Sequence, residues 1–523
     1  MADFKLTYAT MFNTPEELHT RFEKALIQVK ASLGKDHGMI INGRDVLTRD
    51  KFEDHSPVNT DWVLGIFQKG GEKEAREALA AARKAFPMWS GMKWQGRVAL
   101  LRKAADLIDK RLFEIGAAMA LEVGKNRMES LGDVAETADL IRYACYQMEK
   151  NDGFIVEMGK DPLVGYTARN ISVMRPYGVW LVISPFNFPF ALTGGPAGAT
   201  MVAGNTVVMK PATDTPWVVR MLAECFREAG IPDGVFNYVT GPGSTLGQAL
   251  IESPEVDGIT FTGSYDVGMN IYRDFAQGKW VRPIILELGG KNPAIVSRNA
   301  DLERAAIGIM RSAFGLQGQK CSACSRVYIE EKVYDKLVAR LVELTDKLVV
   351  GDPTDRNAYM GPVINKKSYE DYKAFVKILG KAGHILTGGK VLADGDLAKG
   401  YFCAPTLVTD VPHNHRLWKH EMFLPITTIA KVKSLDEAMG YANDVNYGLT
   451  AGFYGSEKET EWFFENIQAG VTYANRPQGA TTGAWPGFQP FGGWKGSGAT
   501  GKNAGGNYYL QLYLREQIHT LVK

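Results

Sequence analysis

Short apolar segments alternate with helical segments between residues 179 and 286, and this alternation constrains the fold more than any other feature of the chain. Strand–helix alternation with short connections predicts a parallel sheet with helices on both faces. Such a sheet binds ligands at the carboxyl ends of its strands. The predicted strands are 179–183, 206–209, 236–239 and 258–261, and the predicted helices are 217–229 and 246–251.

A second alternation follows Asn292 and predicts a second α/β domain. Its strands are expected at 293–296, 326–329 and 427–432, with helices such as 333–348 between them. The part before residue 169 favours helix, because its apolar residues recur on one helical face. The helices predicted there are 72–86, 97–115 and 130–146.

The last residues, 508–520, alternate between apolar and polar side chains and predict a terminal strand. An exposed apolar strand edge pairs readily with another chain. We therefore expect a homo-oligomer, either a dimer or a multiple of dimers.

Length and charge limit the class of protein. A chain of 523 residues is too long for one compact core, so two or three domains are expected. The 60 Lys and Arg residues nearly balance the 58 Asp and Glu residues, which argues against nucleic acid or an anionic membrane as the partner. Residues 178–209 carry no charge, but Pro185, Pro189 and Pro196 interrupt this run, so we predict buried strands and a helix rather than a membrane span.

The cysteines and the first residues of the sequence indicate the cellular compartment. There are five cysteines at irregular spacing, which predicts free thiols in a reducing compartment. The sequence from Met1 to Lys5 resembles neither a secretory signal nor an Arg-rich transit peptide. We expect a cytoplasmic protein.

The segment 318–324 (GQKCSAC) contains the candidate nucleophile. A Cys-x-x-Cys pair is also found in redox and metal sites, but no second cysteine pair and no thioredoxin-like context accompany it here. Most cysteines are small buried hydrophobic residues, and we interpret Cys324 in this way. Cys321 is interpreted differently because of polar residues elsewhere in the chain.

Those polar residues fall at the ends of predicted strands. Glu287 closes a very apolar strand, where a buried carboxylate is costly unless it has a partner or a task. Asn187 is the only polar side chain in the loop 185–189. Lys210 and the segment 261–264 (FTGS) also lie at strand ends, where a ligand of the sheet is expected.

Together these motifs resemble the aldehyde dehydrogenase superfamily, from about residue 72 to the C-terminus. The segment ELGGK at 287–291 is followed, at the family's spacing, by GQKC at 318–321, and then by EMF at 421–423 and PFGG at 490–493 in the family's order. The resemblance implies two doubly wound α/β domains and a β oligomerisation arm. The implied boundaries are 1–150 with 170–286 for the dinucleotide-binding domain, 287–490 for the catalytic domain, and 151–169 with 500–523 for the arm.

The resemblance also implies a reaction. Cys321 attacks the aldehyde carbon as a thiolate, and the Asn187 amide and the Cys321 backbone N–H hold the oxyanion. Oxidation leaves a thioester, which water activated by Glu287 hydrolyses to the carboxylic acid. Covalent catalysis thus divides one difficult oxidation into two easier steps. The thiol needs a low pKa for this role, which a sequence does not reveal.

The cofactor implied by the resemblance is NAD. Lys210 holds the adenosine ribose, Gly263 and Ser264 face the pyrophosphate at a helix start, and Glu421 and Phe423 lie at the nicotinamide ribose and ring. Ser184, Pro185 and Leu288 complete the expected cofactor site. Many NAD-preferring members of the family carry Glu at the position of Thr213, so NADP is also compatible with this chain.

Within the superfamily, the segments 312–324, 475–476, 482–484 and 489–493 resemble the branch that oxidises L-glutamate γ-semialdehyde to L-glutamate in proline catabolism. By this resemblance, Ser322 and the backbone amides of Gly483 and Ala484 grip the substrate carboxylate. The remaining substrate residues implied are Glu136 near the ammonium group, Lys320 beside the nucleophile, and Phe188 and Phe491 on either side of the aliphatic chain. The bulky Trp485 and Pro486 depart from the branch.

Three alternatives stay open. The chain could oxidise another semialdehyde or a plain aliphatic aldehyde, and Glu287 argues against a relative that transfers the acyl group to coenzyme A. A non-catalytic structural relative is disfavoured by the presence of Cys321, Asn187 and Glu287 together. A metal enzyme is suggested only by histidines at 413, 415 and 420, which lie in polar sequence without a supporting acid or cysteine, so we predict no metal.

Overall fold

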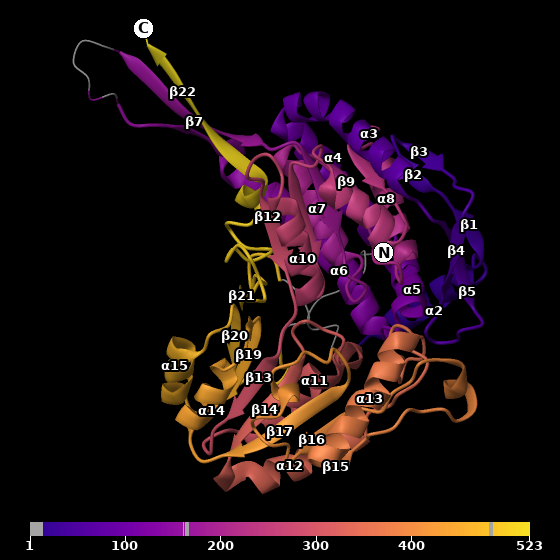
Figure 1. The fold of residues 1–523 in the computed structure, drawn as a ribbon, viewed down its shortest axis with the longest axis vertical. Helices are drawn as coiled ribbons and strands as arrows, with labels where there is room; N and C mark the ends of the chain where they lie inside the picture. The colour runs from indigo at the N-terminus through magenta and orange to yellow at the C-terminus, as the bar shows by residue number, and fades with distance from the viewer. Residues whose placement is uncertain (1–13, 161, 163–166, 481–484, 523) are drawn as a thin grey trace.

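The computed structural model describes residues 14–160, 162, 167–480 and 485–522. In this part of the chain, two seven-stranded sheets with flanking helices form two α/β bodies, and a three-stranded sheet extends away from them (Figure 1). The predicted fold class is therefore confirmed. None of the described helices is both long and apolar enough to cross a membrane.

The first large sheet has the strand order β12-β11-β8-β9-β10-β2-β3. Its strands β8 to β12 run parallel, and the antiparallel pair β2 and β3 completes one edge. Side chains of β8 alternate between the two faces, as strand geometry requires: Val179 and Leu181 pack under one helical layer, Trp180 and Val182 under the other. The bounds are β2 Met39–Ile41, β3 Arg44–Val46, β8 Val179–Ile183, β9 Thr206–Lys210, β10 Phe236–Tyr238, β11 Gly258–Thr262 and β12 Ile284–Glu287.

Helices cover both faces of this sheet. The face of Val179 packs on α3, α9 and α10, and the face of Trp180 packs on α4, α6, α7 and α8. The uncharged run 178–209 folds as β8, α7 and β9, as predicted. The helix bounds are α3 Glu72–Gly91, α4 Trp94–Lys110, α5 Leu112–Val123, α6 Arg127–Lys150, α7 Ala191–Ala203, α8 Pro216–Ala229, α9 Gln248–Glu252 and α10 Tyr265–Ala276.

The second large sheet has the order β15-β16-β17-β14-β13-β19-β20, and only the edge strand β15 is antiparallel to its neighbour. Its strands are β13 Asn292–Val296, β14 Cys324–Glu330, β15 His384–Thr387, β16 Thr406–Thr409, β17 Ile426–Val432, β19 Thr450–Tyr454 and β20 Val471–Ala474. Its helices are α11 Leu302–Phe314, α12 Glu331–Asp346, α13 Lys366–Ala382, α14 Leu435–Asn443 and α15 Glu457–Asn466.

The arm is a long antiparallel ladder. Strand β22 (Leu514–Val522) pairs with β7 (Ala168–Pro176) over the full length of both strands, and β6 (Ile155–Glu157) lies on the other side of β7. Figure 1 shows this ladder projecting from the rest of the molecule. Several apolar side chains on it are exposed, namely Ile155, Val156, Ile518, Leu521 and Val522.

The structure corrects two predicted elements and adds a sheet that was not predicted. The helix predicted over 97–115 is two helices, α4 and α5, because the backbone leaves helical geometry at Arg111. The terminal strand begins at Leu514 rather than at residue 508, and a 3₁₀ turn (Leu510–Tyr513) precedes it. The prediction missed a small sheet in the first 70 residues, formed by β1 Lys35–His37, β4 Lys51–His55 and β5 Val63–Gln68.

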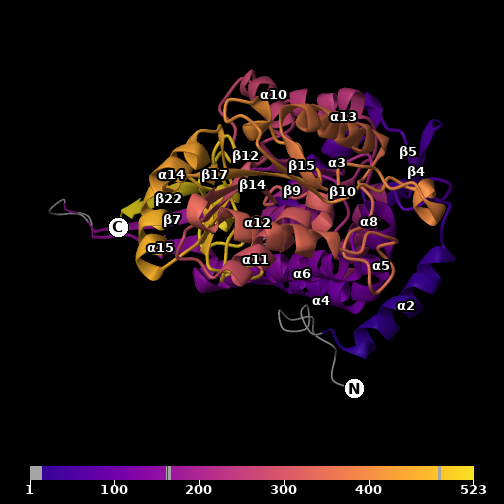
Figure 2. The same cartoon turned by 90° about the horizontal axis from the view of Figure 1, so that it is seen from below.

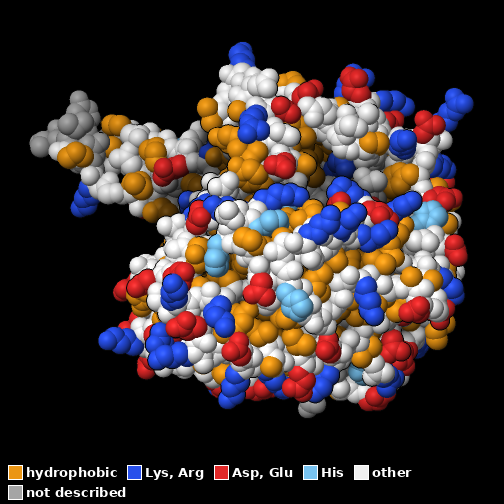
Figure 3. Space-filling view, turned by 60° about the horizontal axis from the view of Figure 1, so that its bottom comes forward, with side chains coloured by type: hydrophobic (Ala, Val, Ile, Leu, Met, Phe, Trp, Pro, Cys, Tyr) orange, Lys and Arg blue, Asp and Glu red, His pale blue; other side chains and the backbone are white. Residues whose placement is uncertain are grey.

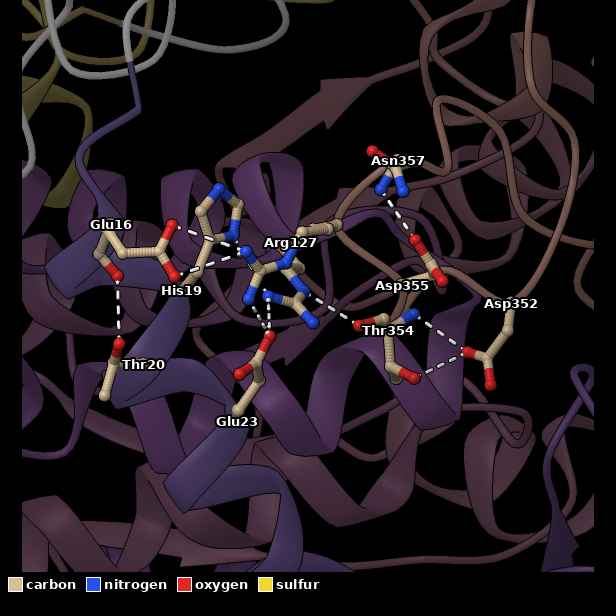
Figure 4. Close-up of polar contacts among 10 residues, drawn as sticks. Glu16, His19, Thr20, Glu23, Arg127, Asp352, Thr354, Asp355 and Asn357 are labelled. Atoms are coloured by element: carbon tan, nitrogen blue, oxygen red, sulfur yellow. Dashed lines mark hydrogen bonds and ion pairs between the residues drawn. The ribbon is translucent and has the colours of Figure 1, made fainter.

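An N-terminal helix, α2 (Glu16–Lys30), packs against α5, and Figure 2 shows it at the edge of the molecule. A polar cluster joins it to both bodies (Figure 4). Arg127, at the start of α6, donates to Glu23 of α2 at 3.0 Å and to the Thr354 carbonyl at 2.7 Å. Arg356 donates to the same Glu23 carboxylate at 2.7 Å. The start of α6 is thereby bonded both to α2 and to the segment around Thr354. Farther along, α6 carries Glu136 of the predicted site.

Candidate active site

Four neighbouring parallel strands of the first sheet end at predicted site residues. β12 ends at Glu287, β11 ends just before Gly263, β8 just before Ser184, and β9 at Lys210. Backbone hydrogen bonds join these ends: Gly263 N–H donates to the Glu287 carbonyl at 3.1 Å, and Ser184 N–H donates to the Lys210 carbonyl at 3.3 Å. The carboxyl edge of the sheet thus brings together residues that lie far apart in the sequence, as the fold class predicts.

A narrow, mostly apolar cavity opens beside this edge. Six residues predicted for the site lie on its wall: Glu136, Phe188, Glu287, Leu288, Cys321 and Phe491. The other lining residues are Leu140, Ala191, Leu192, Gly195, Pro196, Thr262, Ala504 and Tyr509. The nucleophile, the carboxylate and two aromatic rings therefore share one pocket.

The loop that carries Cys321 is held by Asn292, a residue that the sequence analysis did not single out. The Asn292 side-chain amide donates to the Cys321 carbonyl at 2.6 Å and to the Ala323 carbonyl at 2.9 Å, and its oxygen accepts from Thr450 N–H at 3.0 Å. Asn292 begins β13, which pairs with β14, the strand that follows the loop. One buried amide thus connects the nucleophile loop to two strands of the second sheet.

The surroundings of the Cys321 thiol disfavour its thiolate form. Burial, and then the nearby Glu421 and Glu287 carboxylates, raise the pKa of this thiol to about 12. The thiol must therefore lose its proton before it can act as the predicted nucleophile. The residue itself is partly exposed, whereas the other four cysteines are buried.

Glu287 has the properties of a general base that activates water. Burial raises the pKa of its carboxyl to about 8. Its Oε2 atom is buried and has no hydrogen-bond partner among the residues that the structure describes. An unpartnered carboxyl in an apolar wall is costly, and its place on the same cavity wall as the nucleophile gives the cost a chemical reason.

The loop that contains Asn187 and Phe188 rests on a buried ion pair. Lys125 Nζ lies 2.8 Å from Asp133 Oδ2, and both side chains are fully buried. Asp133 also accepts from Ala191 N–H at 2.7 Å, and the Lys125 ammonium lies 3.6 Å from the centre of the Phe188 ring. The pair therefore ties α6 to the loop before α7. Neither Lys125, in the turn between α5 and α6, nor Asp133, inside α6, was predicted, because an isolated polar residue gives no periodic signal.

Asn187 lies next to the nucleophile loop but not on the cavity wall. Its amide donates to the Gln319 carbonyl at 3.0 Å. An amide carries two hydrogens, so the second one remains for another acceptor. The Gln319 side chain in turn accepts from Ile364 N–H at 3.0 Å and fixes the loop from behind.

The residues predicted to bind the substrate are only partly brought together. Lys320 and Ser322 flank the nucleophile and are buried. Burial lowers the pKa of Lys320, an effect that the nearby Glu129 carboxylate opposes. Gly483 and Ala484, the predicted grip for a carboxylate, lie outside the described residues.

The predicted cofactor residues form a second group along the same edge. Burial lowers the pKa of Lys210 to about 8, and its ammonium donates to the Pro211 carbonyl at 2.9 Å. The Glu421 carboxylate accepts from Gly290 N–H at 2.8 Å. Phe423 contacts the Phe186 ring edge-on at 5.8 Å between centroids. A side chain at position 263 would clash with the Phe261 ring. With glycine there, the backbone just before α10 is not covered by a side chain of its own.

One face of the molecule is hollowed by a furrow along which Lys and Arg side chains gather (Figure 3). Basic side chains grouped in this way raise the local concentration of anionic ligands, although Asp and Glu side chains also lie along the furrow (Figure 3). Three or more His, Cys, Asp or Glu side chains in a metal-binding arrangement do not occur in the described part of the chain. His413 stacks on the Tyr441 ring at 4.1 Å.

Comparison with known proteins agrees with this geometry. The sequence model of the aldehyde dehydrogenase family matches residues 46–518. The chain therefore belongs to the aldehyde dehydrogenase family and is an oxidoreductase.

Individual relatives are similar over almost the whole chain. A 1-pyrroline-5-carboxylate dehydrogenase of Geobacillus sp. (strain WCH70) is 42% identical over 508 residues, which cover 96% of each chain. One of Geobacillus thermodenitrificans is 41% identical over 94% of each chain. The crystal structure of a 1-pyrroline-5-carboxylate dehydrogenase from Thermus with bound NAD superimposes with a TM-score of 0.92 at 35% identity, covering 100% of this chain and 99% of that one.

Proposed function

We propose that this protein oxidises L-glutamate γ-semialdehyde, the open form of 1-pyrroline-5-carboxylate, to L-glutamate with NAD. The observation that carries the proposal is the shared cavity: Cys321 and Glu287 lie on its wall together with Glu136 and two aromatic rings. The apolar walls suit an aliphatic aldehyde, and the Glu136 carboxylate on the same wall suits a substrate ammonium group. The similarity to 1-pyrroline-5-carboxylate dehydrogenases supports the same substrate.

The chain's own groups account for the chemistry. The Cys321 thiol loses its proton to solvent, and the sulfur forms a bond to the aldehyde carbon. The Asn187 amide and the Cys321 backbone N–H donate to the oxyanion, and losing one such donor typically costs about 2.7–4 kcal/mol of barrier. In the second step Glu287 takes a proton from water, whose oxygen attacks the thioester carbon as the carbon–sulfur bond breaks.

The cofactor site fits a dinucleotide. Lys210 at the end of β9 and the bare backbone at Gly263 just after β11 support a ribose and pyrophosphate ligand, as does Glu421, which accepts from Gly290 N–H just beyond β12. When bound, the dinucleotide supplies the hydride acceptor. Thr213 offers no carboxylate to repel a 2′-phosphate, so NADP can also bind, although we expect NAD to be preferred. We also expect Ser184, which follows β8, and Ser264, which precedes α10, to line this site.

Substrate choice is tested by steady-state kinetics with glutamate γ-semialdehyde, succinic semialdehyde and propanal. We expect the highest kcat/KM with glutamate γ-semialdehyde and a loss of that preference in Glu136→Gln. Highest activity with propanal would overturn the substrate assignment while leaving the family intact. No NAD reduction with any of the three would point to a non-catalytic relative.

We further propose that the arm joins copies of the chain. Its exposed apolar side chains lie on β6 and β22, and such an exposed strand ladder pairs with another chain. Light scattering of the purified protein, compared with a variant carrying Ile518→Lys and Leu521→Lys, measures the oligomer. The five free cysteines favour a reducing compartment, the cytoplasm.

A further inference from the structure

Two tyrosines just before β22, a strand of the arm, lie near the catalytic cavity. Tyr509 precedes the 3₁₀ turn Leu510–Tyr513 and Tyr513 ends it, and their hydroxyl groups are 2.9 Å apart. The Tyr513 hydroxyl is also 3.2 Å from the Thr260 hydroxyl on β11. Both tyrosines are buried, so three hydroxyl groups form a chain inside the first sheet's core.

The near end of this chain reaches the cavity. Tyr509 lies on the wall that also carries Glu287 and Cys321. Among the described residues of that wall, Tyr509 and Thr262 carry hydroxyl groups. The Glu287 charge is close enough to raise the pKa of both phenols.

The Glu287 carboxyl group and the two phenol groups, Tyr509 and Tyr513, are chemically complementary. Glu287 has a buried oxygen without a partner among the described residues, and buried carboxylates generally find a donor. Burial keeps both phenols protonated near neutral pH by raising their pKa, to about 12 for Tyr513. A hydroxyl group both donates and accepts, and its hydrogen rotates, so the chain Tyr509–Tyr513–Thr260 can adopt either polarity.

We propose that Tyr509 is a positioning residue for Glu287, and that Tyr513 and Thr260 support it from behind. The Tyr509 hydroxyl donates to the Glu287 carboxylate before water is activated. Glu287 then takes a proton from the water that attacks the thioester, and the Tyr509 oxygen accepts from the resulting carboxyl while its own hydrogen turns to Tyr513. This inference rests on the proposed role of Glu287 in hydrolysis.

The test uses an ester, so that it does not depend on dinucleotide or on the identity of the aldehyde. The full-length enzyme is acylated at Cys321 with p-nitrophenyl acetate, excess ester is removed, and decay of the acyl-enzyme is followed by intact mass between pH 6 and 9. Tyr509→Phe is compared with Tyr508→Phe, a matched control because Tyr508 is adjacent and 63% exposed.

In Tyr509→Phe we expect acylation within twofold of the original rate and acyl-enzyme decay slowed roughly tenfold, the size expected for one hydrogen bond to a charged group. Loss of the donor raises the pKa of Glu287, so the decay profile should move to higher pH. Tyr513→Phe should show the same change, but smaller, and Tyr508→Phe none.

Three results would overturn the inference: unchanged decay in Tyr509→Phe, equal slowing of acylation and decay, or slower decay without a shift of the pH profile. The variant Glu287→Gln separates this failure from that of the proposed function. If Glu287→Gln deacylates at the original rate, the role of Glu287 in hydrolysis is wrong. If Glu287→Gln is slow while Tyr509→Phe is normal, only the role of Tyr509 is wrong.

Discussion

Replacing Asn292 with Ala should impair catalysis without touching any reacting atom. The substitution removes three buried hydrogen bonds, two to carbonyls of the nucleophile loop and one from Thr450. At about 0.5–1.5 kcal/mol net for each bond, the loop loses about 3 kcal/mol of restraint. The Cys321 sulfur and the backbone N–H that serves the oxyanion both lie on this loop.

A displacement of about 1 Å at a reacting group lowers the rate by about 100-fold, so we expect kcat/KM of Asn292→Ala to fall by about that factor. Asn292→Asp should be at least as harmful, because a carboxylate would face two carbonyl oxygens. The control is Asn299→Ala, since the Asn299 amide makes an exposed bond of 2.9 Å to Glu459.

Two assays report on the loop. Steady-state oxidation gives kcat/KM, and alkylation by iodoacetamide reports on Cys321 because the other four cysteines are buried. We expect the alkylation rate to change in Asn292→Ala and to stay constant in Asn299→Ala. If Asn292→Ala keeps kcat/KM within threefold and alkylates normally, the restraint assigned to this amide does not exist.

Four further predictions follow from the site. Glu287→Gln should lower kcat by a factor of about 10²–10⁴, and mass spectrometry should find a thioester on Cys321 during turnover. Because burial raises the pKa of Glu287 to about 8, its carboxylate fraction grows as pH rises through 8, so kcat of the unmodified enzyme should increase from pH 6 to above 8; a flat profile would contradict this role. Lys210→Met should raise the KM for NAD roughly tenfold and leave kcat nearly unchanged, since a ribose contact far from the aldehyde contributes to uniform binding. Lys125→Met should destabilise the protein by about 3–5 kcal/mol, because it leaves the Asp133 carboxylate buried without its cation; a melting temperature equal to that of the unmodified protein would refute this estimate.

The sequence determined the fold class, because strand and helix periodicities are local properties of the chain. Val179–Ile183 was predicted to the residue, and β9, β11 and α8 were predicted to within one residue at each end. The ends of elements and the small sheet of β1, β4 and β5 were harder to predict from the sequence. Short exposed strands are defined by their pairing partners rather than by their own residue pattern.

For the site, the sequence predicted Cys321 and Glu287 because each stands in a distinctive motif at a strand end or beside one, and the structure brings both to one cavity wall. Asn292, Asp133 and Tyr509 became visible only in the structure. Each acts through contacts with residues distant in the chain, such as Asp133 with Ala191, 58 positions away. No local pattern encodes such a contact.

The protonation states were also decided by the tertiary structure. Sequence motifs give the identity of an ionisable group, but its pKa depends on burial and on neighbouring charges. Packing raises the pKa of the Cys321 thiol to about 12 and that of Glu287 to about 8. Local residue order thus determined which groups are present, and the folded arrangement determined the charge that each of them carries.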